Sequence, residues 1–200
     1  HPHSNTDQTI FVVHNGIIEN YQDIKTKLQN QDYKFVSETD TEVIPHLIDY
    51  YLQSSGSFEE ALKKALRDLD GAYAIAAITT KEPGKMFAAR LSSPLVIGVG
   101  KKEHLLASDP TALMEHTKKV IFLDDYDMAV ITSKKVSVHN LKKGKMAERN
   151  AELLDYENQE ALLGDFPNFM LKEIFEAPAT IRSATLGRTI ASKNLVKLGG

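Results

Sequence analysis

The segment His14-Asn15-Gly16 combines residue types that could stabilise a negatively charged reaction intermediate. It follows the apolar run Ile-Phe-Val-Val at residues 10–13. At the end of a strand, a carboxamide and a nearby backbone N–H can direct two donors at a developing alkoxide, and glycine allows a substrate to approach the backbone closely. Asn-Gly between apolar runs is also a strong turn signal. The residues therefore leave two interpretations, an oxyanion hole or a turn, and composition alone favours the turn.

A second group of candidate residues lies in Ser-Glu-Thr-Asp-Thr-Glu-Val, residues 37–43. Thr39 or Asp40 could cap the helix that follows, with Glu42 complementing the helix dipole. Alternatively, Asp40 could receive the ammonium group of a ligand at a strand-to-helix junction. The capping interpretation is the simpler one, although a single cap rarely needs three acidic residues within five positions.

The elements that must position these groups can be predicted from periodicity. A strand is expected at residues 10–13, a short polar helix at 20–29 and a second strand at 33–38. Two helices follow, one from Val43 with its proline in the first turn and one after Ser57, which begins a capping box.

From Gly71 onward, short strand candidates follow one another closely. Residues 73–78 are apolar on both alternations, so this strand should be covered on both faces. Most links are too short for helical crossovers, which favours an antiparallel sheet, and strands combined with helices indicate a layered architecture. The candidates are residues 71–80, 85–90, 94–100, 103–108, 119–123, 127–133 and 136–141.

After about Glu152 the strand pattern stops. An apolar stripe from Phe166 to Ile174 predicts a helix, and Pro178 is expected to start another helical segment that Gly187 ends. Residues 191–200 have the composition of a connector to a further segment.

Composition excludes several classes of function. The 200 residues carry a formal net charge of −3, so no basic field for nucleic acid or an anionic membrane is expected. There is no cysteine, which excludes disulfides, Cys–zinc sites and a thiol nucleophile within this chain. The seven histidines lack metal-ligand spacing, so we expect no metal and no cofactor. The start at His1-Pro2-His3 suggests a cytoplasmic protein that is cut at its N-terminus.

Taken together, the segments resemble one family, the glutamine–fructose-6-phosphate aminotransferases, which make glucosamine 6-phosphate. The resemblance extends from His1 to about Pro178 and keeps the family's order and similar gaps. It is carried by His1-Pro2-His3, VVHNGIIENY, FVSETDTEVI, DGAYAI, SPLVIGVG, ASD and MLKEIFEAP.

This resemblance implies an α+β fold of the N-terminal-nucleophile hydrolase type, a four-layer αββα sandwich with mainly antiparallel sheets, incomplete at its N-terminus. Residues 1–155 would form a glutaminase domain, and residues 156–200 a helical linker toward a sugar-isomerase domain. Asn15 and Gly16 match the family's oxyanion hole, and Asp40 matches the acid that holds the α-amino group of glutamine. The implied substrates are glutamine and fructose 6-phosphate, and the full-length protein would be a homo-oligomer.

The sequence also departs from the family. The family nucleophile is an N-terminal cysteine whose α-amino group is the general base, and this chain has no cysteine. The 200 residues alone are therefore expected to be inactive. Two alternatives stay open: another class II glutamine amidotransferase, such as one acting on phosphoribosyl pyrophosphate, and a non-catalytic binding module of the same fold.

Overall fold

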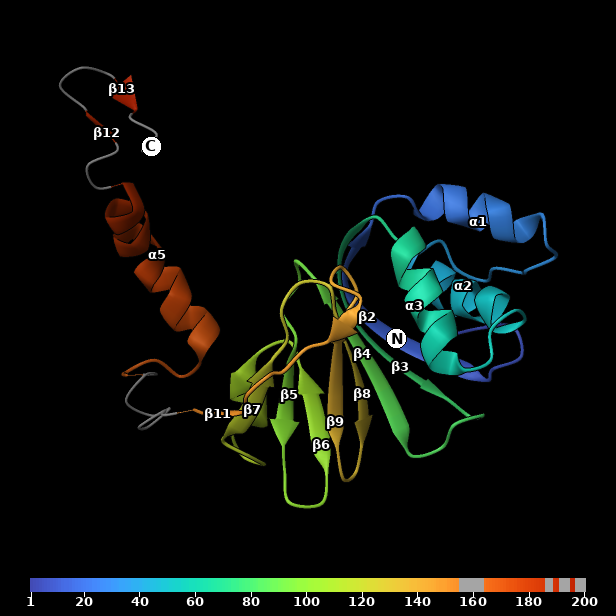
Figure 1. Cartoon of the computed structure of the whole chain (residues 1–200). Coiled ribbons are helices and arrows are strands. Elements are labelled where there is room, and N and C mark those ends of the chain that lie inside the picture. Colours follow the sequence, from blue (N-terminus) through green and yellow to red (C-terminus); the bar gives the residue numbers. More distant parts are fainter. Residues whose placement is uncertain (155–163, 186–188, 191–194, 197–200) are drawn as a thin grey trace. The chain divides into compact units, whose positions relative to one another are not determined.

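The computed structural model describes residues 1–154, 164–185, 189–190 and 195–196 (Figure 1). The chain divides into two compact units, His1–Leu154 and Asp155–Gly200. Among the described residues, no helix is both long enough and apolar enough to cross a membrane.

The first unit is built on a seven-stranded antiparallel sheet in the order β1-β2-β3-β4-β8-β9-β10. Residues 73–78 lie in its third strand, which is largely buried as the two-sided apolar pattern predicts. The strands are β1 (His3–Ser4), β2 (Ile10–Ile18), β3 (Gly71–Thr79), β4 (Lys85–Leu91), β8 (Asp127–Thr132), β9 (Val136–Asn140) and β10 (Lys145–Met146).

A four-stranded antiparallel sheet packs against one face of the seven-stranded sheet. Its order is β11-β7-β5-β6, and the apolar contact between the sheets includes Ala88 and Ala129 from the first sheet and Ile97 and Ile121 from the second. Its strands are β5 (Val96–Val99), β6 (His104–Ala107), β7 (Lys119–Phe122) and β11 (Glu152–Leu153). The strands predicted after Gly71 are therefore confirmed, and so is their antiparallel pairing.

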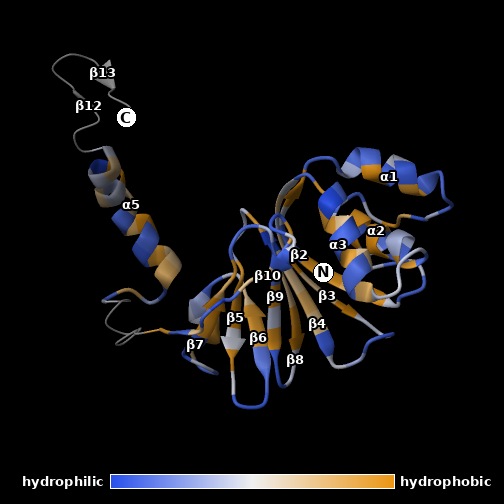
Figure 2. Ribbon diagram, in the orientation of Figure 1, coloured by the Kyte–Doolittle hydropathy of each residue, from blue (hydrophilic) through white to orange (hydrophobic). Residues whose placement is uncertain are grey.

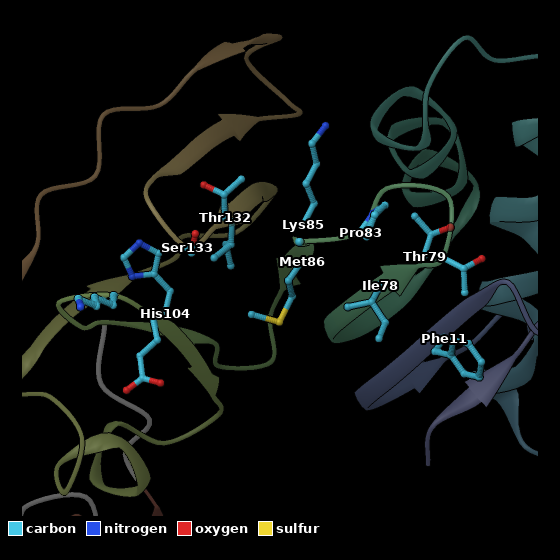
Figure 3. A pocket seen from close by; sticks show the side chains of 14 residues that line it. Phe11, Ile78, Thr79, Pro83, Lys85, Met86, His104, Thr132 and Ser133 are labelled. Atoms are coloured by element: carbon cyan, nitrogen blue, oxygen red, sulfur yellow. The ribbon is translucent and has the colours of Figure 1, made fainter.

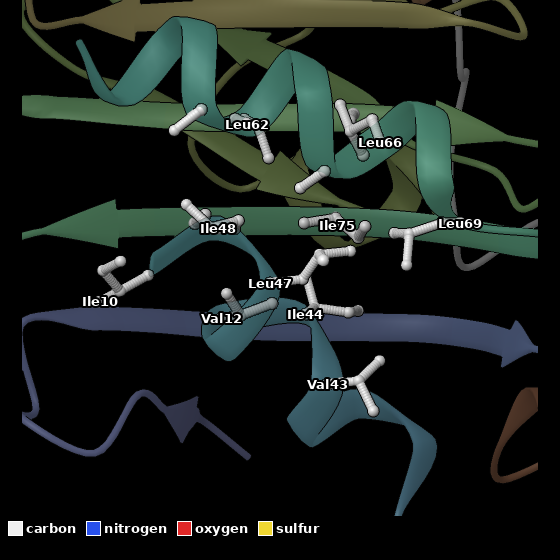
Figure 4. Packing of buried hydrophobic residues seen from close by; sticks show 14 of the residues in the cluster. Ile10, Val12, Val43, Ile44, Leu47, Ile48, Leu62, Leu66, Leu69 and Ile75 are labelled. Atoms are coloured by element: carbon white, nitrogen blue, oxygen red, sulfur yellow. The ribbon is translucent and has the colours of Figure 1, made fainter. Parts of the chain in front are cut away.

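Three helices cover the opposite face of the seven-stranded sheet: α1 (Tyr21–Gln29), α2 (Val43–Leu52) and α3 (Phe58–Asp68). Their apolar sides meet the β2 and β3 side chains in the main core (Figure 4), and Figure 2 shows the hydrophobic residues gathered where the layers meet. Ser57 caps α3 by accepting from the Glu60 backbone N–H at 3.3 Å. The Glu60 carboxylate bonds Lys63 instead, so only half of the expected capping box forms.

The strand predicted at residues 33–38 is wrong, because this segment adopts no regular structure. The backbone N–H groups of Val36 and Ser37 both donate to the Glu42 carboxylate, at 2.8 Å each, and not to another strand. The Val36 side chain is 93% exposed, whereas Tyr33 and Phe35 pack half-buried against the core, so the segment keeps an apolar face without strand pairing. A side-chain acceptor five or six residues away has replaced the strand ladder.

The described residues of the first unit supply three layers: helices, seven-stranded sheet and four-stranded sheet. The outer face of the four-stranded sheet is covered by the short 3-10 helix η2 (Pro110–Leu113), where Leu113 packs on Val96 and Val120. In this unit, the short helix η2 is all that occupies the position of the fourth layer of the expected sandwich.

The second unit contains the helix α5 (Phe169–Thr185) and the short paired strands β12 (Thr189–Ile190) and β13 (Leu195–Val196). The prediction that Pro178 starts a new helix is wrong, because Pro178 lies inside α5. Gly187, the expected helix end, lies outside the described residues. Several apolar side chains of α5 are exposed, among them Met170 at 74% and Phe175 at 66%.

Candidate active site

Strand β2 runs without interruption through Asn15 and Gly16. Every residue from Ile10 to Ile18 pairs with β3, with Asn15 opposite Ala74 and Gly16 opposite Tyr73. The turn interpretation of Asn-Gly is therefore wrong. Gly16 has φ +134°, and a Cβ at this position would lie 2.0 Å from the Ala72 carbonyl oxygen. Glycine is needed here because two backbones approach closely, not because the chain reverses.

The alternation of side chains along β2 places neighbouring residues on opposite faces of the sheet. His14 is buried at 4% exposure on the helical side, whereas Asn15 is exposed on the other side. There Asn15 and Val13 line a cavity of about 180 Å³ with Ala74 and Ala76 from β3 and residues 106–108 at the end of β6. The carboxamide therefore faces a cavity between the two sheets.

Asp40 reaches the same strand from the 3-10 helix η1 (Asp40–Glu42). Its Oδ2 accepts from the backbone N–H of Ile18 at 2.7 Å. The cap of η1 is Thr39, whose hydroxyl accepts from the Thr41 backbone N–H at 3.4 Å. The capping interpretation thus applies to Thr39, and the Asp40 carboxylate is directed to the edge of β2.

The spacing along β2 suits a small, elongated substrate. Ile18, which bonds Asp40, is three positions from Asn15, a separation of about 10 Å between Cα atoms in a strand. Residues two apart in an antiparallel strand direct their N–H groups to the same edge, so the N–H of Gly16 is expected on the edge where Ile18 meets Asp40. A carboxylate thus lies near one end of this stretch, and an amide donor pair near the other.

His14 supports this arrangement from behind. Its Nδ1 lies 3.0 Å from the Thr41 hydroxyl, so β2 and η1 are joined by a second polar contact. Burial lowers the pKa of His14, although the nearby Asp40 carboxylate acts in the opposite direction. The imidazole is therefore neutral at pH 7. Among the described residues, no group hydrogen-bonds its buried Nε2.

Glu42 is the residue whose role sequence patterns missed. Its side chain is 2% exposed and accepts from the Ser37 hydroxyl at 2.5 Å as well as from two backbone N–H groups. Burial raises the pKa of this carboxyl, but the hydrogen bonds from Ser37 and Val36 outweigh burial and hold it below the ordinary value. Glu42 therefore fixes the segment that leads to Asp40.

We expect Glu42→Gln to lower the free energy of unfolding by about 2 kcal/mol at pH 7, because a buried ionised acceptor of several hydrogen bonds is lost. A lowered pKa stabilises the fold fully above about pH 4.5, and this contribution disappears as the pH falls through the folded-state pKa. Denaturant unfolding should therefore show a larger difference between variant and wild type at pH 7 than at pH 3.

The matched control is Glu60→Gln, since the Glu60 side chain is 56% exposed and, among the described residues, its carboxylate bonds only Lys63. It should change the free energy of unfolding by less than about 0.5 kcal/mol. Equal effects of the two variants would contradict the assigned role of Glu42.

A cavity of about 560 Å³ lies elsewhere in the first unit, at the ends of β3, β4 and β8 (Figure 3). Its lining includes Phe11, Ile78, Met86 and His104, but not Asn15 or Asp40. The described residues contain no cluster of three or more histidine or acidic side chains that could hold a metal ion. Neither observation adds a cofactor to the site.

Residues 1–115 match the family described as a glutamine amidotransferase domain. Among curated relatives, a glutamine–fructose-6-phosphate aminotransferase (isomerizing) from Methanothermobacter thermautotrophicus is 47% identical over 182 residues, covering 91% of this chain. One of the same name from Clostridium acetobutylicum is 41% identical over 193 residues, covering 96%. The chain spans only 30% and 31% of the length of these two relatives.

Solved structures support the same fold. The glutamine phosphoribosylpyrophosphate amidotransferase of B. subtilis, complexed with ADP and GMP, superposes with a TM-score of 0.56 at 27% identity, over 70% of this chain and 30% of that chain. An allosteric regulatory enzyme of purine biosynthesis superposes with a TM-score of 0.57 at 26% identity. The expected N-terminal-nucleophile hydrolase fold with antiparallel sheets is thereby confirmed.

Proposed function

Because the chain belongs to the family of glutamine amidotransferase domains, we propose that it is part of an enzyme that hydrolyses glutamine and transfers the ammonia to fructose 6-phosphate. The product would be glucosamine 6-phosphate. The names of the relatives that are 37–47% identical to this chain support this acceptor. One observation supports the proposed hydrolysis of glutamine. Asp40 accepts from the N–H of Ile18, and the same strand carries Gly16 two positions and Asn15 three positions before Ile18.

In this proposal, Asp40 binds the α-ammonium group of glutamine while the side-chain amide extends along β2 toward Asn15. A thiolate attacks the amide carbonyl, and the carbonyl oxygen becomes an oxyanion. The Asn15 carboxamide and the Gly16 N–H donate to that oxyanion, and each such donor typically stabilises the transition state by about 3–4 kcal/mol. The buried, neutral His14 positions Thr41 and η1 and does not exchange protons with substrate.

The nucleophile lies outside these 200 residues in this proposal, because the chain contains no cysteine. Residues 1–155 are proposed as the glutaminase domain, and residues 156–200 as a linker toward a sugar-isomerase domain. The division of the chain after Leu154 and the greater length of the relatives support this assignment. A cytoplasmic location is proposed because phosphorylated sugars do not cross membranes unaided. The full-length protein is also proposed to be a homo-oligomer, which light scattering can test.

The deciding experiment supplies the full-length protein with glutamine labelled with nitrogen-15 at the side-chain amide, together with fructose 6-phosphate in one reaction and phosphoribosyl pyrophosphate in another. We expect the label in glucosamine 6-phosphate, as measured by mass spectrometry. Transfer of the label to phosphoribosyl pyrophosphate, with none to fructose 6-phosphate, would assign the chain to a different amidotransferase. No release of the label under any condition would favour a binding module without catalysis.

The 200-residue chain by itself should release no ammonia from glutamine above the buffer rate, because none of its side chains is a thiol. A coupled ammonia assay at pH 7 tests this, with the full-length protein as the positive control. Glutamine turnover by the isolated chain, retained after repeated purification, would contradict the proposed cysteine mechanism.

Replacing Asp40 with asparagine in the full-length protein should raise KM for glutamine about 30-fold and leave kcat within a few-fold. Asparagine retains an oxygen that accepts from the Ile18 N–H but loses the charge that pairs with the substrate ammonium, worth about 2 kcal/mol in both ground and transition states. Steady-state glutaminase kinetics measure both constants.

The control is Glu38→Gln, which removes an exposed carboxylate two residues away. It should leave KM for glutamine unchanged. If Asp40→Asn is silent, or if Glu38→Gln raises KM as much, the α-ammonium group binds elsewhere.

A further inference from the structure

A cavity of about 350 Å³ lies where the chain passes from α3 into β3. Its apolar walls come from Leu66, Leu69, Leu91 and Leu141, and its polar lining from Arg67, Asp70, Tyr73, Tyr126 and Lys142. Its volume lies in the range of small-molecule sites, and apolar walls with a few converging polar groups are typical of them.

This cavity is separate from the Asn15 site. Tyr73 belongs to the core between the helices and the seven-stranded sheet, whereas Asn15 lies opposite Ala74 and faces the four-stranded sheet. Because successive side chains of β3 point to opposite faces, the two sites are on opposite sides of the same sheet.

Tyr73 is the first indication of a ligand. Its side chain is 2% exposed and lines the cavity, yet no described residue forms a hydrogen bond with its hydroxyl. Burial, together with Tyr126 and Asp125 nearby, raises the pKa of Tyr73 to about 12, so the hydroxyl stays protonated and can donate. The Tyr73 ring is therefore buried while its hydroxyl stays accessible at the cavity, where it can donate to a ligand.

The charges at the cavity supply the second indication. In the part of the chain that the structure describes, neither Arg67 nor Lys142 forms an ion pair or a side-chain hydrogen bond. The Lys142 ammonium lies 5.1 Å above the ring of Tyr126. Arg67 and Lys142 are both exposed residues of the cavity lining. Two cations at one cavity favour an anion, and the guanidinium fork matches phosphate oxygens in particular.

Asp70 also lines the cavity, and its carboxylate pairs with no cation of the described residues, while its backbone is fixed by Asn20 and Glu19. A carboxylate beside two cations disfavours a ligand that is anionic throughout. It accepts readily from hydroxyl groups, as the Tyr73 hydroxyl can as well.

From this lining we infer a second binding site, which takes a small hydroxylated monophosphate of the sugar-phosphate type. Arg67 and Lys142 bind the phosphate, Tyr73 and Asp70 bind hydroxyls, and the leucines with the Tyr126 ring contact the carbon skeleton. The lining residues, and not the proposed reaction, point to this ligand class.

The test is equilibrium dialysis of the full-length protein with labelled glucose 6-phosphate, which measures bound equivalents per chain and their affinity. Arg67→Gln and Lys142→Gln should each weaken one class of sites about tenfold or more, and the double variant should bind one equivalent fewer than wild type. Tyr73→Phe, which removes only the hydroxyl, should weaken the same class about fivefold.

Lys143→Gln is the matched control, because Lys143 is an exposed neighbour of Lys142 with the same charge and does not line the cavity. It should change affinity less than about twofold. The proposal is overturned if the cavity variants bind as wild type does, if Lys143→Gln weakens binding equally, or if wild type and double variant bind the same number of equivalents. Any other sugar-phosphate site would bind the same number of equivalents in wild type and in the double variant. The difference between these two proteins therefore tests this cavity alone and does not depend on the proposed reaction.

Discussion

Replacing Asn15 with alanine in the full-length protein should lower kcat for glutamine hydrolysis by roughly two to three orders of magnitude. The carboxamide faces the cavity between the sheets and is proposed to donate to an oxyanion that exists only during reaction. The ground-state amide makes little use of this donor, so KM for glutamine should stay nearly constant. Steady-state glutaminase assays, with folding checked by melting temperature, provide both constants.

Val13→Ala is the matched control for Asn15→Ala. Val13 lies two positions earlier on the same face of β2, lines the same cavity and is 45% exposed, but it carries no donor. Its replacement should leave kcat within a few-fold of wild type. A rise in KM with unchanged kcat for Asn15→Ala would show that Asn15 only binds substrate, and the proposed oxyanion hole would be wrong.

Replacing Gly16 with alanine should destabilise the domain by at least about 3 kcal/mol, or prevent folding, independently of any substrate. The added Cβ would lie 2.0 Å from the Ala72 carbonyl oxygen and 2.7 Å from its carbon, and φ is +134°. Both obstacles involve backbone, which cannot move without breaking the β2–β3 ladder. For a chain of this size the melting temperature should fall by about 6–12 °C, measured by calorimetry.

Gly56→Ala is the control for this substitution, because a Cβ at Gly56 meets no atom within 4 Å and its φ is not in the left-handed region. It should be neutral or slightly stabilising. If Gly16→Ala melted like wild type and lost only activity, close approach of the substrate, and not the strand contact, would explain the glycine.

The sequence predicted the sheet strands well because their signals are local. Alternating or continuous apolar runs bounded by turn residues need little tertiary information, and the strands after Gly71 form as expected. The segment 33–38 has the same local signal but bonds Glu42 through its backbone, which no periodicity reveals. The prediction that a helix starts at Pro178 was wrong because a helix can continue through a proline at the loss of one hydrogen bond.

At the candidate site, residue types could be selected from the sequence but their partners could not. Asn15, Gly16 and Asp40 were identified by the motifs that contain them, yet the bond between Asp40 and Ile18 spans 22 residues and depends on the fold. The contact between His14 and Thr41 likewise joins segments 27 residues apart. The turn interpretation of Asn15-Gly16 failed because a glycine can also serve a close contact between two strands.

The alternation along β2 also determines how this strand would respond to random mutation. Ile10, Val12 and Ile18 are fully buried, so a screen for stability alone would retain them. Asn15 is exposed and contributes little to packing, so only a screen for activity would retain it. Selection on expression level would thus enrich folded variants that have lost the carboxamide. A library of this domain can be sorted first for stability and then for activity. Along β2, the first sort should retain the buried even-numbered residues Ile10, Val12 and Ile18, and the second should retain the odd-numbered Asn15.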